Sequence, residues 1–178
     1  AQVLLAVMAS FYAVHHGPEG LAAIARRILA LREALAEALT VLGLPPEPGP
    51  GFDTLVVRTP EALSLRERAA AAGFNLRQGT DGQAASGAGA LAISLDELSN
   101  PEELQRLLAA LAPNAALAAQ SAGALQARLA AAPEASPWAL GGVPLRRDPW
   151  LGQEVFHRYR SETELLRYIQ HLVSKDLS

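Results

Sequence analysis

The segment "FDTLVVRTPEALSLRERAAAAGFNLR", residues 52–77, predicts a strand, a helix and a second strand in succession. Hydrophobic residues alternate over 52–58, which places Leu55 and Val57 on the same face of a strand. Thr59 is the expected N-cap of a helix that ends at Gly73, because Pro60 suits the first helical position and glycine closes a helix readily. Residues 74–77 then predict a short second strand.

A third strand is predicted at residues 90–97, "ALAISLDE", after a loop rich in Gly, Ser and Ala at 79–89. Asn100 and Pro101 are typical of a helix start, and the following helix carries an apolar stripe as far as about Leu111. Few strands, with helices to cover one face, indicate an α+β fold, a two-layer sandwich. The expected core of this sandwich is formed by Leu55, Val57, Phe74, Leu76, Leu91 and Ile93.

Two helices precede this region. Residues 2–16 are apolar on nearly every side, which predicts a largely buried helix that ends at Gly17. Pro18 then begins an amphipathic helix that reaches Leu42 and is long enough to lie between two bodies. The Pro- and Gly-rich residues 43–51 predict a linker.

The region after the third strand and its helix is less regular. Residues 112–149 are rich in Ala and Pro, and we expect an irregular or partly helical surface excursion without a function. Ser161 followed by Glu164 predicts a capping box at the start of a final amphipathic helix. The expected organisation is interdomain helices at 1–43, a small α+β domain at 52–148 with the excursion at 112–148, and a linker with the first helix of a following half at 149–178.

Composition excludes several classes of function. The net charge is −3 and the arginines are scattered, so no basic patch for nucleic acid is expected. The apolar N-terminal run lacks the basic flank of a signal peptide and the length of a membrane span, and with no initiator Met it suggests a piece of a longer protein. The absence of cysteine excludes disulfides and Cys-type zinc sites and is compatible with a cytoplasmic location.

The adjacent histidines His15 and His16 are the first candidates for chemistry. Neighbouring residues on a helix point about 100° apart, so the two rings do not converge on one metal ion. We expect them to lie at a helix end, where a protonated histidine offsets the negative end of the helix dipole. Contact with the site of a neighbouring domain is the alternative.

Two further pairs of polar residues are ambiguous. Asn75 and Arg77 lie on the strand face opposite Phe74 and Leu76, where an arginine either binds an anion or is merely exposed at a sheet edge. Two acidic residues, at 96 and 97, follow the third strand and serve either as an acid/base pair or as turn formers.

The sequence contains no nucleophile elbow and no phosphate-binding loop, and the glycines of residues 79–89 favour a flexible loop. Lys175 is the only lysine. A Schiff-base lysine would therefore lie outside this sequence or be this one, near the end of the final helix. The residues predict no catalytic, cofactor-binding or metal-binding side chain.

Five segments, in this order, resemble the P-protein family of the glycine cleavage system: "AQVLLAVMASFYAVHHGPEGL", "FDTLVV", "NLR", "ISLDE" and "VFHRYRSETELLRYIQHLVSKDL". The resemblance implies the small domain of an aspartate-aminotransferase-like (fold type I) enzyme, from the end of an N-terminal half into a C-terminal half. It also implies a glycine dehydrogenase that decarboxylates glycine with pyridoxal phosphate and transfers the aminomethyl group to the lipoyl group of H-protein.

In that family the lysine that holds pyridoxal phosphate belongs to the C-terminal half, so the resemblance implies that the cofactor binds outside this segment. The implied partners are glycine, lipoylated H-protein and the remaining domains, in a homodimer or pseudo-dimer. A noncatalytic interaction module and the small domain of another fold type I enzyme are the alternatives. The candidate interface or substrate-channel residues are His16, Asn75, Arg77, Asp96, Glu97 and Glu162.

Overall fold

The computed structural model describes residues 2–49, 51–78, 89–131, 146 and 148–176. It divides the chain into two compact units, one formed by Ala1–Ala25 with Arg146–Ser178 and the other by Arg26–Leu145. The first helix, α1 (Val3–Val41), contributes residues to both units. The predicted boundaries at 1–43, 52–148 and 149–178 stay a prediction, because the division into units does not test which segments are interdomain helices.

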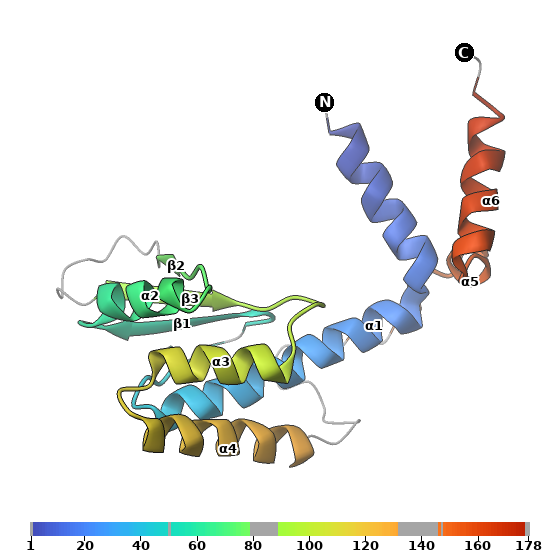
Figure 1. The fold of residues 1–178 in the computed structure, drawn as a ribbon. Helices are drawn as coiled ribbons and strands as arrows, with labels where there is room; N and C mark the ends of the chain where they lie inside the picture. Colours follow the sequence, from blue (N-terminus) through green and yellow to red (C-terminus); the bar gives the residue numbers. More distant parts are fainter. Residues whose placement is uncertain (1, 50, 79–88, 132–145, 147, 177–178) are drawn as a thin grey trace. The chain divides into compact units, whose positions relative to one another are not determined.

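The larger unit contains a three-stranded antiparallel sheet (Figure 1). Its strands are β1 (Thr54–Thr59), β2 (Arg77–Gln78) and β3 (Gly89–Ser94), in the order β1-β3-β2. In the β1–β3 pair Leu55 lies opposite Ile93 and Val57 opposite Leu91. These four side chains are buried, which confirms the predicted inward face of each strand.

Three helices of this unit follow strands β1 and β3 in the chain and pack in succession, beginning at the sheet. They are α2 (Ala62–Ala71), α3 (Pro101–Leu111) and α4 (Ala115–Ala131). Helix α2 contacts β1 and β3, α3 contacts α2, and α4 contacts α3. The chain is therefore α+β, as its pattern of strands and helices predicts. The predicted stripe of α3 is buried and consists of Leu104, Leu107, Leu108 and Leu111.

The second half of α1 also belongs to this unit, where its apolar stripe is buried from Ile28 to Leu42. Arg27 donates hydrogen bonds to the carbonyl oxygens of Glu97 and Ser99, at 2.5 and 2.8 Å. These bonds fasten α1 to the turn between β3 and α3. After α1 the chain turns back along β1, and the backbone N–H of Glu47 donates to the carbonyl of Val56 at 2.7 Å.

The prediction of an irregular or partly helical excursion over residues 112–149 agrees with a helix in the described part of that range. Helix α4 covers Ala115–Ala131 as one regular helix, and Asn114 accepts a hydrogen bond from the backbone N–H of Leu117 at its start. Alanine has the highest helix propensity, so an alanine-rich segment forms a helix even where larger apolar residues leave a weak stripe. Residues 132–145 and 147 of the predicted excursion, and residues 79–88 of the loop predicted at 79–89, lie outside the described residues, and Gly89 is the first residue of β3.

Three details around α2 correct the prediction. Thr59 is the last residue of β1 and not an N-cap, and its hydroxyl accepts a bond of 3.3 Å from the backbone N–H of Glu61. The second strand is shorter than residues 74–77 and begins at Arg77. Phe74 is half-buried and not a core residue, and the guanidinium carbon of Arg106 lies over its ring, 5.4 Å from the centroid.

The smaller unit contains the first part of α1 with α5 (Val155–Arg158) and α6 (Glu162–Val173). Helical geometry breaks at Gly17, as predicted, and the predicted capping box of Ser161 and Glu164 is present. The prediction that residues 2–16 are largely buried is wrong for residues 2–10, whose side chains are exposed. In the described part of this unit only Val14 and Gly17 are buried. The short helix α5 and helix α6 are too few to surround α1.

None of the helices in the described residues is both long enough and apolar enough to cross a membrane.

Candidate functional site

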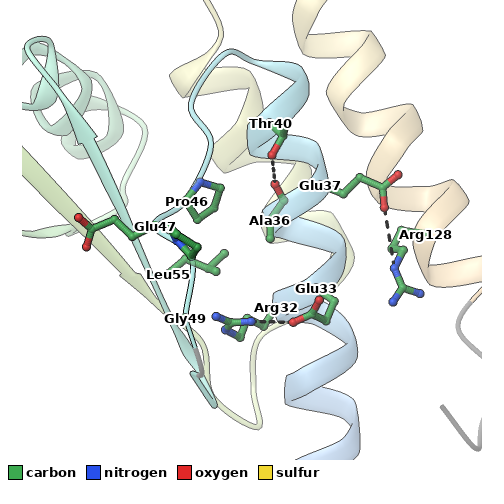
Figure 2. Close-up of a pocket in the computed structure, with 11 residues that line it drawn as sticks. Arg32, Glu33, Ala36, Glu37, Thr40, Pro46, Glu47, Gly49, Leu55 and Arg128 are labelled. Carbon is green, nitrogen blue, oxygen red and sulfur yellow. Dashed lines mark hydrogen bonds and ion pairs between the residues drawn. The ribbon is translucent and has the colours of Figure 1, made fainter. Parts of the chain in front are cut away.

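The larger unit contains a pocket with a volume of about 560 Å³ (Figure 2). Helix α1 forms one wall, the loop after α1 and strand β1 form another, and Arg128 of α4 closes one side. Its charged lining residues are Arg32, Glu33, Glu37, Glu47 and Arg128. Neither the histidines nor the polar residues singled out in the sequence contribute to it.

Each charged side chain that lines this pocket forms an ion pair. The guanidinium of Arg32 lies 2.6 Å from the carboxylate of Glu33, and that of Arg128 lies 3.8 Å from Glu37. Glu47 pairs with Arg58. Among the described lining residues, none holds a nucleophile beside a base.

Arg32 is the least satisfied of these groups, because its Nε atom is buried without a hydrogen-bond partner. The open side of its guanidinium faces Gly51, where an added Cβ would lie 2.9 Å from Nη2. The guanidinium of Arg32 therefore occupies the place that a side chain at position 51 would need.

A second cluster surrounds the helix break at Gly17 in the smaller unit. Arg160 donates a hydrogen bond of 3.5 Å to the carbonyl of His15 and one of 3.3 Å to the carboxylate of Glu19. Its guanidinium occupies the place of a side chain at Gly17, since an added Cβ there would lie 2.0 Å from Nη1. Nothing in the sequence near either residue signals this contact.

The rings near this break form a set of aromatic contacts. His15 and His16 meet edge to face with centroids 5.0 Å apart, and His16 lies 4.3 Å from the ring of Tyr12. Nδ1 of His15 is buried and has no hydrogen-bond partner. The position of both histidines just before Gly17 agrees with the predicted helix end. In the residues that the structure covers, no group of three or more His, Cys, Asp or Glu side chains is placed to hold a metal ion.

Asn75 and Arg77 are exposed at the β2 edge of the sheet. Arg77 lies opposite Ala92 of β3, and no ion pair joins it to a described residue. Both interpretations need an exposed guanidinium at a sheet edge, so the choice between them stays a prediction.

Asp96 and Glu97 lie in the turn between β3 and α3. The carboxylate of Asp96 accepts hydrogen bonds from the hydroxyl of Ser99 and from the backbone N–H groups of Leu98 and Ser99. The Ser99 hydroxyl is the main cause of a lowered pKa of Asp96, because it stabilises the charged form. A general acid needs a raised pKa, so the geometry favours the turn-former interpretation of this pair.

Glu162 is the exposed first residue of α6. The neighbouring Glu164 belongs to the capping box, and its hydrogen bond with the hydroxyl of Ser161 lowers the pKa of its carboxyl. Glu162 and His16 belong to the smaller unit, whereas Asn75, Arg77, Asp96 and Glu97 belong to the larger one. Within the described residues of the larger unit, no hydrogen bond joins Asn75 or Arg77 to Asp96 or Glu97.

Comparison with known proteins gives a consistent result over the chain. The family model described as "Glycine cleavage system P-protein" matches residues 1–111. The chain is 53% identical over 178 residues to "Glycine dehydrogenase (decarboxylating)" of Prochlorococcus marinus strain MIT 9303, and 53% identical to that of Synechococcus sp. strain RCC307. It is 39% identical over 178 residues to the corresponding protein of Shewanella pealeana. In each case the match covers 100% of this chain and 17% of the relative.

Proposed function

Because the chain belongs to the glycine cleavage system P-protein family, we propose that it forms a structural segment of a glycine dehydrogenase (decarboxylating). The observation that carries the proposal is 53% identity over all 178 residues to a protein of that name, of which the segment spans 17%. The proposed activity of the complete enzyme is decarboxylation of glycine and transfer of the aminomethyl group to the lipoyl group of H-protein. The proposed location is the cytoplasm.

The proposed fold of the complete enzyme is aspartate-aminotransferase-like, and this segment is its small α+β domain with adjoining helices. The antiparallel sheet β1-β3-β2 with its packed helices supports this assignment, as does a long α1 that contributes to two units. Homodimer or pseudo-dimer formation is part of the same proposal.

The segment's own residues do not fit a pyridoxal phosphate site. Lys175, the only lysine, is exposed in the turn after α6 and does not line the pocket described above. The cofactor supplies an electron sink for the bond-breaking step when it is bound. We therefore place its binding residues in other parts of the enzyme and assign none to this chain.

The role proposed for this segment is packing against the remaining domains. Its candidate contact residues carry polar groups without a catalytic arrangement; five of the six are exposed, His16 is partly exposed, and none lines the pocket described above. Such groups suit an interface or the wall of a substrate channel. The residues concerned are His16, Asn75, Arg77, Asp96, Glu97 and Glu162.

A chimera tests this function. The segment replaces its counterpart in the Prochlorococcus marinus enzyme, to which it is 53% identical, and the exchange of labelled bicarbonate into glycine is measured with H-protein present. We expect the chimera to keep activity within about tenfold of the parent, which corresponds to a loss of about 1.4 kcal/mol in transition-state stabilisation. A soluble chimera that binds pyridoxal phosphate but lacks exchange activity would contradict the proposal. A chimera with the segment deleted is the negative control.

A further inference from the structure

The start of α1 is apolar on every side. Residues 3–8 read Val-Leu-Leu-Ala-Val-Met, and no charged residue occurs among residues 1–14. Successive residues of a helix point about 100° apart, so six consecutive side chains cover all directions around the helix axis. This part of α1 therefore has no polar face to turn toward water.

These side chains are nevertheless exposed. The exposed fractions are 70% for Val3, 70% for Leu4, 66% for Leu5, 41% for Val7 and 58% for Met8. Helices at the surface of soluble proteins usually have one polar face, whereas helices that are apolar all round are buried in large proteins. An exposed apolar surface of this extent indicates a missing contact.

The one polar side chain in the next turn does not depend on water. The hydroxyl of Ser10 donates a hydrogen bond of 2.7 Å to the carbonyl of Ala6 in the same helix. A serine with this bond has its hydrogen-bonding need met within the helix, so it is compatible with an apolar environment.

The smaller unit covers only one side of α1, and only farther along the helix. The rings of Phe11 and Tyr168 meet with centroids 6.2 Å apart. Beyond this contact α1, blue in Figure 1, and α6, red, diverge toward the two chain ends. Leu166, Leu172 and Val173 of α6 are exposed as well. Helix α6 therefore leaves residues 3–8 uncovered.

Because residues 3–8 are apolar on all sides, their partner has to contact the helix from more than one direction. A second copy of the chain, packed against one side of α1, would cover that side and leave the opposite side in water. Enclosure needs several elements around one helix, and relatives of which this segment is only 17–18% have enough further polypeptide to provide them.

We infer that residues 3–8 of α1 are enclosed on all sides by other parts of the same glycine dehydrogenase polypeptide. This inference rests on the proposed function and goes further, because it names the element that is embedded and the manner of its contact. The partner surface is apolar and concave, formed by at least two elements.

Met8 is the only methionine of the chain and reports directly on enclosure. The chimera described above is treated briefly with hydrogen peroxide, and oxidation of Met8 is followed by mass spectrometry of the peptide that contains it. We expect oxidation in the folded chimera to be at least about tenfold slower than in the urea-unfolded chimera and in the isolated 178-residue chain. Leu98→Met, at a position that is 78% exposed, provides the fast reference rate in the isolated chain.

Two results would overturn the inference. One is oxidation of Met8 in the folded chimera at the rate of the unfolded chimera. The other is a slow rate already in the isolated chain together with a dimer in sedimentation, which would make a second copy the partner. An active chimera with an accessible Met8 would remove this inference alone, whereas an inactive chimera with a protected Met8 would contradict only the proposed function.

Discussion

Gly17 is restricted to glycine for two independent reasons. Its backbone angles, φ 59 and ψ −173, lie in a region that other residues almost never adopt. The guanidinium of Arg160 also fills the space of a Cβ, at 2.0 Å from Nη1. The helix break and the contact between α1 and the segment before α6 therefore depend on the same missing side chain.

Gly17→Ala is expected to loosen this contact. Backbone strain of about 1–3 kcal/mol and displacement of Arg160 should increase amide hydrogen exchange in residues 11–25. Gly123→Ala in α4 is the matched control, since nothing lies within 4 Å of the added Cβ. It should slow exchange in α4 and stabilise the protein by about 0.5–1 kcal/mol, because alanine is the better helix former. Unchanged exchange in Gly17→Ala would contradict the strain argument.

Asp96 makes the stability depend on pH in the acid range. Its pKa is lowered in the folded protein, chiefly by the Ser99 hydroxyl, so its stabilising effect is complete above the unfolded pKa. This effect is lost as the pH falls through the lower pKa of the folded state. Asp96→Asn should therefore be less stable than the wild type at neutral pH, with a difference that shrinks below about pH 4.

Urea unfolding midpoints of both proteins across the acid range test this expectation. Ser99→Ala removes the largest cause of the lowered pKa and should show the same weaker pH dependence as Asp96→Asn. Parallel curves for wild type and Asp96→Asn would show that Asp96 has the same pKa in the folded and unfolded states.

Among the helices, those with strong end signals could be predicted from the sequence most accurately. Asn100 accepts a bond of 3.0 Å from the backbone N–H of Glu103 and Pro101 is the first helical residue, as predicted for α3. The start of α2 was not predictable in this way. Thr59 pairs with Gly89 in the sheet, and this pairing with a distant strand outweighs the local preference of threonine for an N-cap.

Asn100→Ala should lower the free energy of unfolding of the larger unit by about 1 kcal/mol, the usual cost of losing an N-cap. Since α3 packs with four buried leucines, loss of the cap should affect the larger unit as a whole. Asn100→Ser keeps an acceptor oxygen and should stay close to the wild type. Urea unfolding followed by circular dichroism measures both. An Asn100→Ala midpoint equal to that of the wild type would show that packing alone fixes the start of α3.

Between the two units, the burial of apolar side chains is unequal. The larger unit contains almost the entire buried core, whereas Val14 is the only buried large apolar residue described in the smaller one. The sequence predicted the core of the larger unit well, because strand alternation and helix stripes are local patterns. It did not predict the contact of Arg160 with His15, which joins residues 145 positions apart, or the paired charges of the pocket.

A core substitution should separate the two units experimentally. Leu108 is completely buried, and Leu108→Ala should destabilise the larger unit by about 2–5 kcal/mol. Hydrogen exchange should rise in α2 and α3 and stay unchanged in α6, which belongs to the smaller unit. Leu98→Ala, at an exposed position, is the control and should change neither. Faster exchange in α6 as well would show that the two units unfold together.

The loop that follows α1 protects the sheet from unwanted association. The backbone N–H of Glu47 donates a hydrogen bond to the carbonyl of Val56 on the outer edge of β1. A strand of another molecule would otherwise be able to pair with this edge. Pro45, Pro46 and Pro48 leave this loop with few N–H donors of its own, so it does not extend the sheet outward. Proteolytic nicking within residues 44–48 would consequently uncover the outer edge of β1 and leave it available to pair with a strand of another molecule.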